Sequence, residues 1–155
     1  MVGPTVTVLT YVDSSVLVRS YLADEPKHAV ARGLVESRSV LTTSTLALLE
    51  VSSALVRAAR SRRIGDVDTL LAKLYEEVSP AGPIVLIRAN TLDTENTARV
   101  LVRRFGIRAL DALHLAIAHL TARPLAGQGD EIGFATYDPD QLAAAADLGF
   151  VDHSP

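Results

Sequence analysis

The sequence predicts an α/β fold in which a central parallel β-sheet is flanked by α-helices within a single domain, residues 1–155. Short apolar runs of strand length alternate with longer segments in which apolar residues recur at helical spacing. Parallel strands need a crossover connection, and a helix is the usual crossover. The chain has 155 residues, of which 48% are hydrophobic, and this is enough for one well-packed core.

Runs of β-branched and aliphatic residues mark the predicted strands. The first is the apolar part of the opening segment TVTVLTYVDSSVLVRSYL. Later runs read SVLT, IVLI and GFATY, and FV forms a short run near the end. The predicted strands are therefore 6–12, 39–42, 84–87, 133–137 and 150–151.

Start and stop signals between these runs predict the helices. Pro26 is expected to begin one helix, and Asp66 is expected to cap another after the stop at Gly65. Asp138 followed by Pro139 begins the last helix. The predicted helices are 16–22, 26–38, 44–62, 66–78, 92–105, 109–122 and 138–149.

The composition excludes several classes of protein. There are no cysteines, so disulfides and thiolate metal sites are excluded, which suits a cytoplasmic location. No apolar run approaches the roughly 18 residues of a membrane span, and the start of the chain lacks the features of a signal peptide. The sequence therefore predicts a cytoplasmic protein without membrane contact.

Arginine dominates the basic residues, although the net charge is −3. It accounts for 13 of the 15 basic side chains, and its guanidinium can pair with phosphate through two hydrogen bonds. The densest group is Arg57, Arg60, Arg62 and Arg63. This group can be a solvated helix end, where cations interact favourably with the helix dipole, or a set of phosphate contacts.

Four carboxylates occur in unexpected surroundings. Asp13 and Asp138 each follow a predicted strand, and Asp13 ends an apolar run with no basic neighbour. Glu50 is the only charge in TLALLEVSSALV, and Asp111 is the only charge in ALDALHLAIAHL. Helical spacing surrounds both with mainly small or apolar residues, so we expect them to face protein. An unpaired buried carboxylate is costly and normally finds a cation or changes its pKa.

The predicted fold indicates where these acids meet. In an open parallel sheet, ligands gather beyond the carboxyl ends of the strands, so Asp13 and Asp138 are candidates for one rim. The helices that carry Glu50 and Asp111 can close over it. Two like charges about 4 Å apart cost on the order of 4 kcal/mol at an effective dielectric of about 20, and a divalent cation relieves this repulsion. Oxygen ligands favour Mg²⁺ or Mn²⁺ over zinc.

Each acid also has a structural interpretation. Asp13 and Asp138 can cap the helices that follow them, and capping is compatible with metal binding. Glu50 can pair with an arginine such as Arg57. Asp111 can pair with an arginine three residues earlier, at 108.

Two neighbours of these acids are also candidates. His114, three residues after Asp111, can be a metal ligand, although a lone histidine in LHLAIA is more often packed and hydrogen-bonded. Asp140, two residues after Asp138, is expected to complement the dipole of the last helix rather than to bind metal.

Four segments carry a more specific signal, namely YVDSSVLV, ALLEVSSAL, IRALDALHLAIA and FATYDPDQLAAAADLGF. Together they resemble the PIN domain, and within it the VapC-type ribonuclease toxins of bacterial toxin–antitoxin pairs. The resemblance extends from Asp13 to Gly149, and DALHLA is its most specific part. It implies a PIN-like single domain with one acidic pocket that binds Mg²⁺, with Mn²⁺ as a substitute.

The resemblance also implies roles for individual residues. By position, the pocket acids are Asp13, Glu50, Asp111 and Asp138, with Asp13 and Asp111 as the principal metal ligands. Glu50 and Asp138 would bind a second ion, hold water or act as general base, and the choice between one and two ions stays open. Thr136 matches the small polar residue that precedes the fourth acid in the family.

The implied function is that of a metal-dependent endoribonuclease that hydrolyses RNA phosphodiester bonds as the toxin of a toxin–antitoxin system. The implied partners are the RNA substrate, a cognate antitoxin protein and a second copy of the chain in a homodimer. Aromatic residues make up only 5% of the chain, so we expect recognition of RNA shape or of an exposed loop rather than base stacking.

Two alternative functions remain. The chain can be a catalytically inert PIN-like module that binds RNA or protein without cutting. A haloacid-dehalogenase-like phosphatase also places an aspartate after its first strand, but it needs a second aspartate two residues on, where this chain has Ser15. Ser14 and Ser15 instead fit a role in positioning Asp13 or a metal-bound water.

Overall fold

The computed structural model describes residues 3 and 6–155, and it confirms the α/β prediction. Five parallel strands form one sheet in the order β3-β2-β1-β4-β5. The strands are β1 (Val8–Val12), β2 (Val40–Ser44), β3 (Ile84–Ile87), β4 (Glu131–Ala135) and β5 (Val151–Asp152). Residues 1–2 and 4–5 of the predicted domain lie outside the described residues.

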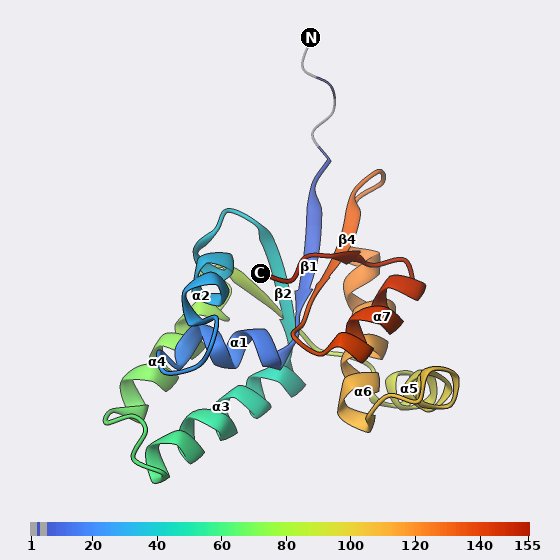
Figure 1. The fold of residues 1–155 in the computed structure, drawn as a ribbon. Coiled ribbons are helices and arrows are strands. Elements are labelled where there is room, and N and C mark those ends of the chain that lie inside the picture. Colours follow the sequence, from blue (N-terminus) through green and yellow to red (C-terminus); the bar gives the residue numbers. More distant parts are fainter. Residues whose placement is uncertain (1–2, 4–5) are drawn as a thin grey trace.

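Helices connect the strands and cover both faces of the sheet (Figure 1). In the described part of the chain they are α1 (Ser14–Tyr21), α2 (His28–Glu36), α3 (Thr45–Arg60), α4 (Val67–Glu77), α5 (Thr91–Phe105), α6 (Ala109–Ile117) and α7 (Pro139–Asp147). After α6 the chain continues through a π-helical turn (Ala118–Ala122) and a 3₁₀ turn (Arg123–Leu125). Across these described helices, none has the length and apolar character that a membrane span requires.

The predicted start of the second helix is wrong by two residues. The helix begins at His28 rather than at Pro26. Lys27 has a left-handed backbone conformation with φ of 63°, and the amide of His28 donates to the carbonyl of Glu25 at 3.3 Å. Pro26 therefore lies in a tight turn, where its fixed φ is equally well accommodated.

Each face of the sheet has its own apolar core. Side chains alternate along a strand, so Tyr11 and Val12 at the end of β1 point to opposite faces. Val12 belongs to the cluster with Leu55 of α3, under α1 to α4. Tyr11 belongs to the cluster with Leu115 and Phe134, under α6 and α7. Figure 1 shows these two helical layers on either side of the sheet, so both faces of β1 are covered.

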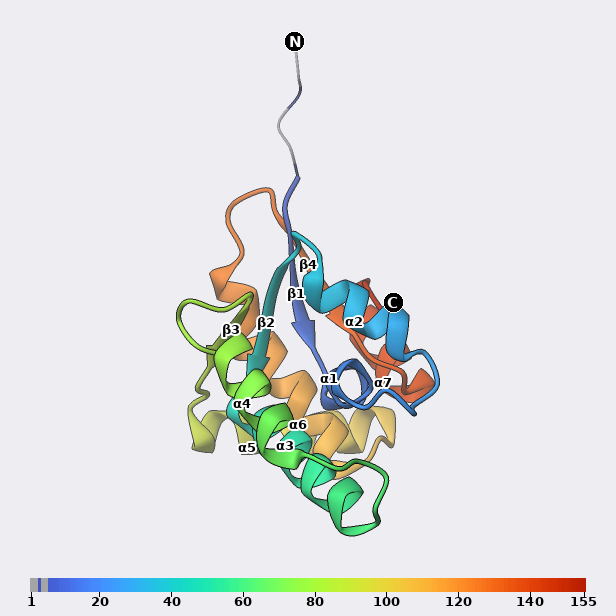
Figure 2. The same ribbon diagram turned by 90° about the vertical axis from the view of Figure 1, so that its left-hand side faces the viewer.

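The strand order reverses beside β1. The chain adds β2 and β3 on one side of β1, and then adds β4 and β5 on the other side. Such a reversal opens a crevice beyond the carboxyl ends of the strands. The amide of Asp13 donates to the carbonyl of Ala135 at 2.9 Å, so the ends of β1 and β4 stay together there. Figure 2 shows α1, α3 and α6 gathered below the carboxyl ends of β1 and β2.

Leu55 tests the core beneath α3. Its side chain is 0% exposed, whereas Leu49 of the same helix is 69% exposed. Leu55→Ala is expected to lower the free energy of unfolding by about 3 kcal/mol, because it removes buried methyl groups and leaves a cavity. Leu49→Ala is the matched control and should change that free energy by less than about 0.5 kcal/mol. Urea unfolding followed by circular dichroism measures both, and equal losses would contradict the assigned packing.

Candidate active site

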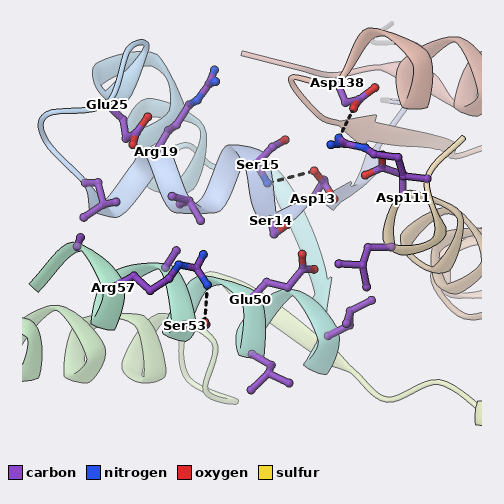
Figure 3. A pocket seen from close by; sticks show the side chains of 18 of the residues that line it. Asp13, Ser14, Ser15, Arg19, Glu25, Glu50, Ser53, Arg57, Asp111 and Asp138 are labelled. Atoms are coloured by element: carbon purple, nitrogen blue, oxygen red, sulfur yellow. Dashed lines mark hydrogen bonds and ion pairs between the residues drawn. The ribbon is translucent and has the colours of Figure 1, made fainter. Parts of the chain in front are cut away.

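The four acids singled out in the sequence line one groove. The groove has a volume of about 1140 Å³ and is bounded by α1, α3 and the start of α6. Asp13, Glu50, Asp111 and Asp138 all contribute to its wall. Figure 3 shows Glu50 on α3 pointing across the groove toward Asp13 at the end of β1. The structure therefore brings together side chains that are far apart in the sequence.

Asp13 is the most deeply buried of these acids, with 3% of its surface exposed. Its Oδ2 accepts a hydrogen bond from the amide of Ser15 at 3.1 Å, so Asp13 caps α1. Its Oδ1 lies 3.5 Å from Nε2 of His114 and accepts from Nε2 of Gln141, also at 3.5 Å. The capping interpretation is confirmed, and the second carboxylate oxygen is directed toward the other side chains of the site.

Asp111 and Asp138 share one arginine. The guanidinium of Arg108 donates to Oδ2 of Asp111 at 3.0 Å and to Oδ2 of Asp138 at 2.7 Å. Asp138 also caps α7, because its Oδ1 accepts from the amides of Asp140 and Gln141. Burial raises the pKa of Asp111, the contact with Arg108 opposes this effect, and the charge of Asp138 adds to it. The pairing of Asp111 with Arg108 is therefore confirmed, and Asp138 joins it.

A buried histidine contacts the other two acids. His114 is 1% exposed, and its Nε2 lies 2.5 Å from Oε1 of Glu50. Its Nδ1 lies 2.7 Å from the hydroxyl of Tyr11, which in turn lies 2.7 Å from Oγ of Ser44. Burial opposes a charged imidazole, but the hydrogen bond to Glu50 and the charges of Asp13 and Glu50 outweigh it, so the pKa of His114 is raised. The packed, hydrogen-bonded interpretation of His114 is confirmed.

Tyr11 and Gln141 also belong to the site, although neither was predicted from the sequence. Gln141 is fully buried, and its Nε2 donates to Asp13 and to the main-chain carbonyl of Asp111 at 3.3 Å. Its Oε1 accepts from the hydroxyl of Thr136 at 2.6 Å. A single amide among apolar residues in DPDQLAAAA, three positions after a capping acid, is the signal that could have found it. Tyr11 gave no such signal, because tyrosine is common in strands.

Small polar side chains fasten the loop before α7. Oγ of Ser15 accepts from the amide of Tyr137 at 3.0 Å. Oγ1 of Thr136 accepts from the amide of Asp138 at 3.1 Å, and it also donates weakly to Asp13 at 3.4 Å. These bonds tie the end of β4 to the start of α1, which fixes the first and fourth acids relative to each other.

The arginine group at 57–63 is divided between two environments. Arg57 and Arg63 line the groove, and the other two members lie outside its lining. Within the described structure Arg57 donates to Oγ of a serine one turn earlier and does not pair with Glu50, which pairs with His114 instead. Arg63 forms ion pairs with acids in the turn after α1.

The donor atoms of the groove fit a hard divalent cation. Residues 3 and 6–155 contain no three His, Asp or Glu side chains that are already gathered closely enough to hold a metal ion. Four carboxylates nevertheless face one groove, and carboxylate oxygens are the ligands that Mg²⁺ and Mn²⁺ take. Arg108 supplies positive charge beside Asp111 and Asp138, and the imidazole of His114 lies beside Asp13 and Glu50. Because the side chain of Arg108 is exposed, it can withdraw without disturbing the core.

The family follows from comparison with known proteins. The model of the PIN domain family matches residues 10–146, which is most of the chain. The chain belongs to the PIN domain family. A search among curated protein sequences found no match.

Solved structures with this PIN fold include VapC toxins. VapC20 of Mycobacterium tuberculosis, described as a sarcin-ricin loop cleaving toxin, is similar to this chain with a TM-score of 0.63 and 25% identity, covering 94% of this chain and 99% of its own. PAE2754 of Pyrobaculum aerophilum has a TM-score of 0.56 and 20% identity, and the match covers 95% of this chain and 83% of PAE2754. VapBC-1 of nontypeable Haemophilus influenzae has a TM-score of 0.56 and 14% identity, and the match covers 93% of this chain and 97% of the VapBC-1 chain. The resemblance to VapC-type PIN domains is therefore confirmed.

Gln141 tests the hydrogen bonding behind the acids of this PIN domain. Gln141→Leu is expected to lower the free energy of unfolding by about 1–3 kcal/mol, because buried polar groups of Thr136 and Asp111 lose their partner. The other glutamine of the chain, Gln128, is exposed in a loop, so Gln128→Leu is the matched control and should change little. Chemical denaturation measures both variants. Two equally small effects would show that Gln141 does not support the site.

Proposed function

We propose that this chain is a metal-dependent endoribonuclease that hydrolyses RNA phosphodiester bonds as the toxin of a toxin–antitoxin system. One observation carries the proposal: four carboxylates from the β1–α1 junction, α3, α6 and the β4–α7 junction face one groove where the strand order reverses. Membership of the PIN family and the similarity to VapC20 support the reaction class.

The proposed ion is Mg²⁺, with Mn²⁺ as a substitute. Asp13 and Asp111 would be its principal ligands, and Glu50 and Asp138 would bind a second ion, hold water or act as general base. When bound, such an ion would lower the pKa of a coordinated water, so that it loses a proton more readily, and would neutralise charge on the scissile phosphate.

Side chains of the protein would orient the reactants and move the proton. The helix cap and Gln141 fix Asp13 at the end of β1. The side chain of Glu50 is 27% exposed toward the groove, and its Oε1 is held by Nε2 of His114. Its Oε2 would then accept the proton of the attacking water, which makes Glu50 the proposed general base. Tyr11 contacts the other nitrogen of His114 and thereby orients the imidazole.

The arginines of the groove are proposed to bind the RNA backbone. Arg19 on α1 and Arg57 on α3 lie on opposite walls of the groove, away from its acidic end (Figure 3). An RNA strand in the groove would therefore meet guanidinium groups beside the acidic cluster, and guanidinium groups bind phosphate well. VapC20 is described as cleaving the sarcin-ricin loop. An exposed RNA loop is the proposed substrate class for this chain as well.

A cognate antitoxin is the second proposed partner. The VapC-type resemblance implies it, and the similarity to VapC20, which is described as a toxin, supports it. Val18, Leu46 and Leu49 add apolar side chains to the lining of the groove, and apolar side chains of a partner protein can cover such a surface. We propose that the pair acts in the cytoplasm, where a chain without cysteine needs no disulfide.

Metal dependence is the main test of this proposal. Purified chain without antitoxin is expected to cleave total RNA with Mg²⁺ or Mn²⁺ and to lose this activity in EDTA. Asp13→Asn and Asp111→Asn should each lower the cleavage rate by more than about 100-fold, because each removes a charged metal ligand. Denaturing gels measure the rate, circular dichroism checks the fold, and mapping the 5′ ends of the fragments identifies the cleaved RNA.

Asp140→Asn is the matched control for Asp138→Asn. Both acids lie at the start of α7, but Asp140 is exposed and outside the groove, so we expect loss of activity only for Asp138. Asparagine caps a helix about as well as aspartate, so the fold should survive both changes.

Cleavage that persists in EDTA would falsify the metal mechanism. Binding of RNA without cleavage in either metal would favour an inert binding module.

A homodimer is the proposed oligomeric state, because the VapC-type resemblance implies one. Sedimentation equilibrium at micromolar concentration is expected to give twice the mass of the chain. The measurement is made without antitoxin, so that a mixed complex cannot account for the mass. A purely monomeric profile would contradict the proposal.

A further inference from the structure

Arg108 lies in an unusual place for an exposed arginine. Its side chain is 78% exposed, yet its guanidinium donates to both Asp111 and Asp138. These two carboxylates are themselves only 16% and 21% exposed. Arg108 therefore covers both acids at the edge of the groove, between them and the solvent.

Arg108 and His114 each lie within ion-pair distance of two of the four acids. His114 contacts Glu50 and approaches Asp13, whereas Arg108 contacts the remaining two. Among the described residues, no other basic side chain lies within ion-pair distance of these four acids. Like-charged carboxylates that face one partly buried groove repel one another. Arg108 thus places a positive charge beside the two carboxylates where a divalent cation would place two.

The guanidinium can leave this place without disturbing α6. Arg108 begins the helix through its backbone, because its carbonyl accepts from the amide of Ala112 at 2.9 Å. Its side chain makes no capping hydrogen bond in the described structure. An exposed ion pair shifts an equilibrium by at most about fivefold. Two such contacts therefore favour the paired position of the Arg108 side chain over a free one by at most about thirtyfold. A divalent cation, which has twice the charge, can displace it.

We propose that Arg108 holds the place of the divalent cation in the metal-free protein and turns to a phosphate of bound RNA when the cation enters. The inference rests on the proposed function. The displaced side chain stays attached at the start of α6, beside the acids where the scissile phosphate must lie. A guanidinium pairs with phosphate through two hydrogen bonds. The groove would therefore offer this positive charge to RNA only after the cation has bound.

Mn²⁺ binding measures the competition directly. Electron paramagnetic resonance of free Mn²⁺ gives its Kd for the full chain purified without antitoxin. Arg108→Gln is expected to tighten Mn²⁺ binding by about threefold to thirtyfold, because the competing cation is gone. Arg57→Gln is the matched control, since it removes the same charge from the same groove but Arg57 contacts Ser53 rather than an acid. It should change the affinity by less than about twofold.

The possible results separate the two proposals. Unchanged or weaker Mn²⁺ binding by Arg108→Gln overturns the inference. An equal gain in Arg57→Gln also overturns it, because that would indicate a general effect of charge. If the unmodified chain binds no Mn²⁺, the proposed metal site itself fails. If the unmodified chain and Arg108→Gln bind Mn²⁺ with the same affinity, the metal site is retained and only the inference about Arg108 fails.

The phosphate contact predicts a second effect of opposite sign. At saturating Mn²⁺, Arg108→Gln is expected to lower kcat/KM for RNA cleavage by about tenfold or more, the usual effect of losing a charged hydrogen bond. The slope of log kcat/KM against log salt concentration should become shallower by about 0.7, the value for one phosphate contact on a single strand. Misfolding does not tighten metal binding while it slows cleavage. Unchanged kcat/KM and slope would overturn the phosphate contact.

Discussion

Mutual repulsion among four carboxylates is the constraint on which the rest of the site depends. Water would screen these charges on an open surface, but Asp13 is buried and the other three are only partly exposed. Several polar groups around them oppose that repulsion, including two helix N-termini, the amide of Gln141 and the guanidinium of Arg108. Carboxylate oxygens are also the ligands that hard divalent ions take, so the ion proposed above would relieve the same repulsion.

The two apolar cores make this arrangement possible. β1 is packed on both faces, so the position of its carboxyl end is fixed by Tyr11 on one side and Val12 on the other. Helices α3 and α6 lie on opposite layers, yet their acids meet in one groove because both helices extend past the strand ends. Rigid packing of this kind limits how far the acids can separate to relieve their repulsion.

The fold and the four acids could be predicted from sequence because both are marked by differences between residues that are neighbours along the chain. Apolar periodicity distinguishes strands from helices, and a lone acid such as Glu50 or Asp111 stands out in an apolar helix. The partners of those acids could not be predicted in the same way. The contact of His114 with Glu50 joins residues 64 positions apart, and it depends on side-chain directions that only packing decides. Pro26 was placed in a helix because its fixed φ suits a turn and a first helical turn equally.

The first turn of α7 has a consequence for the relative position of two acids. Oδ1 of Asp138 accepts from the backbone amide of Gln141, and the side chain of the same glutamine donates to Asp13. The two acids are thus connected through one residue of α7. A shift of that helix would move both of them, so their relative position depends on a side chain that carries no charge.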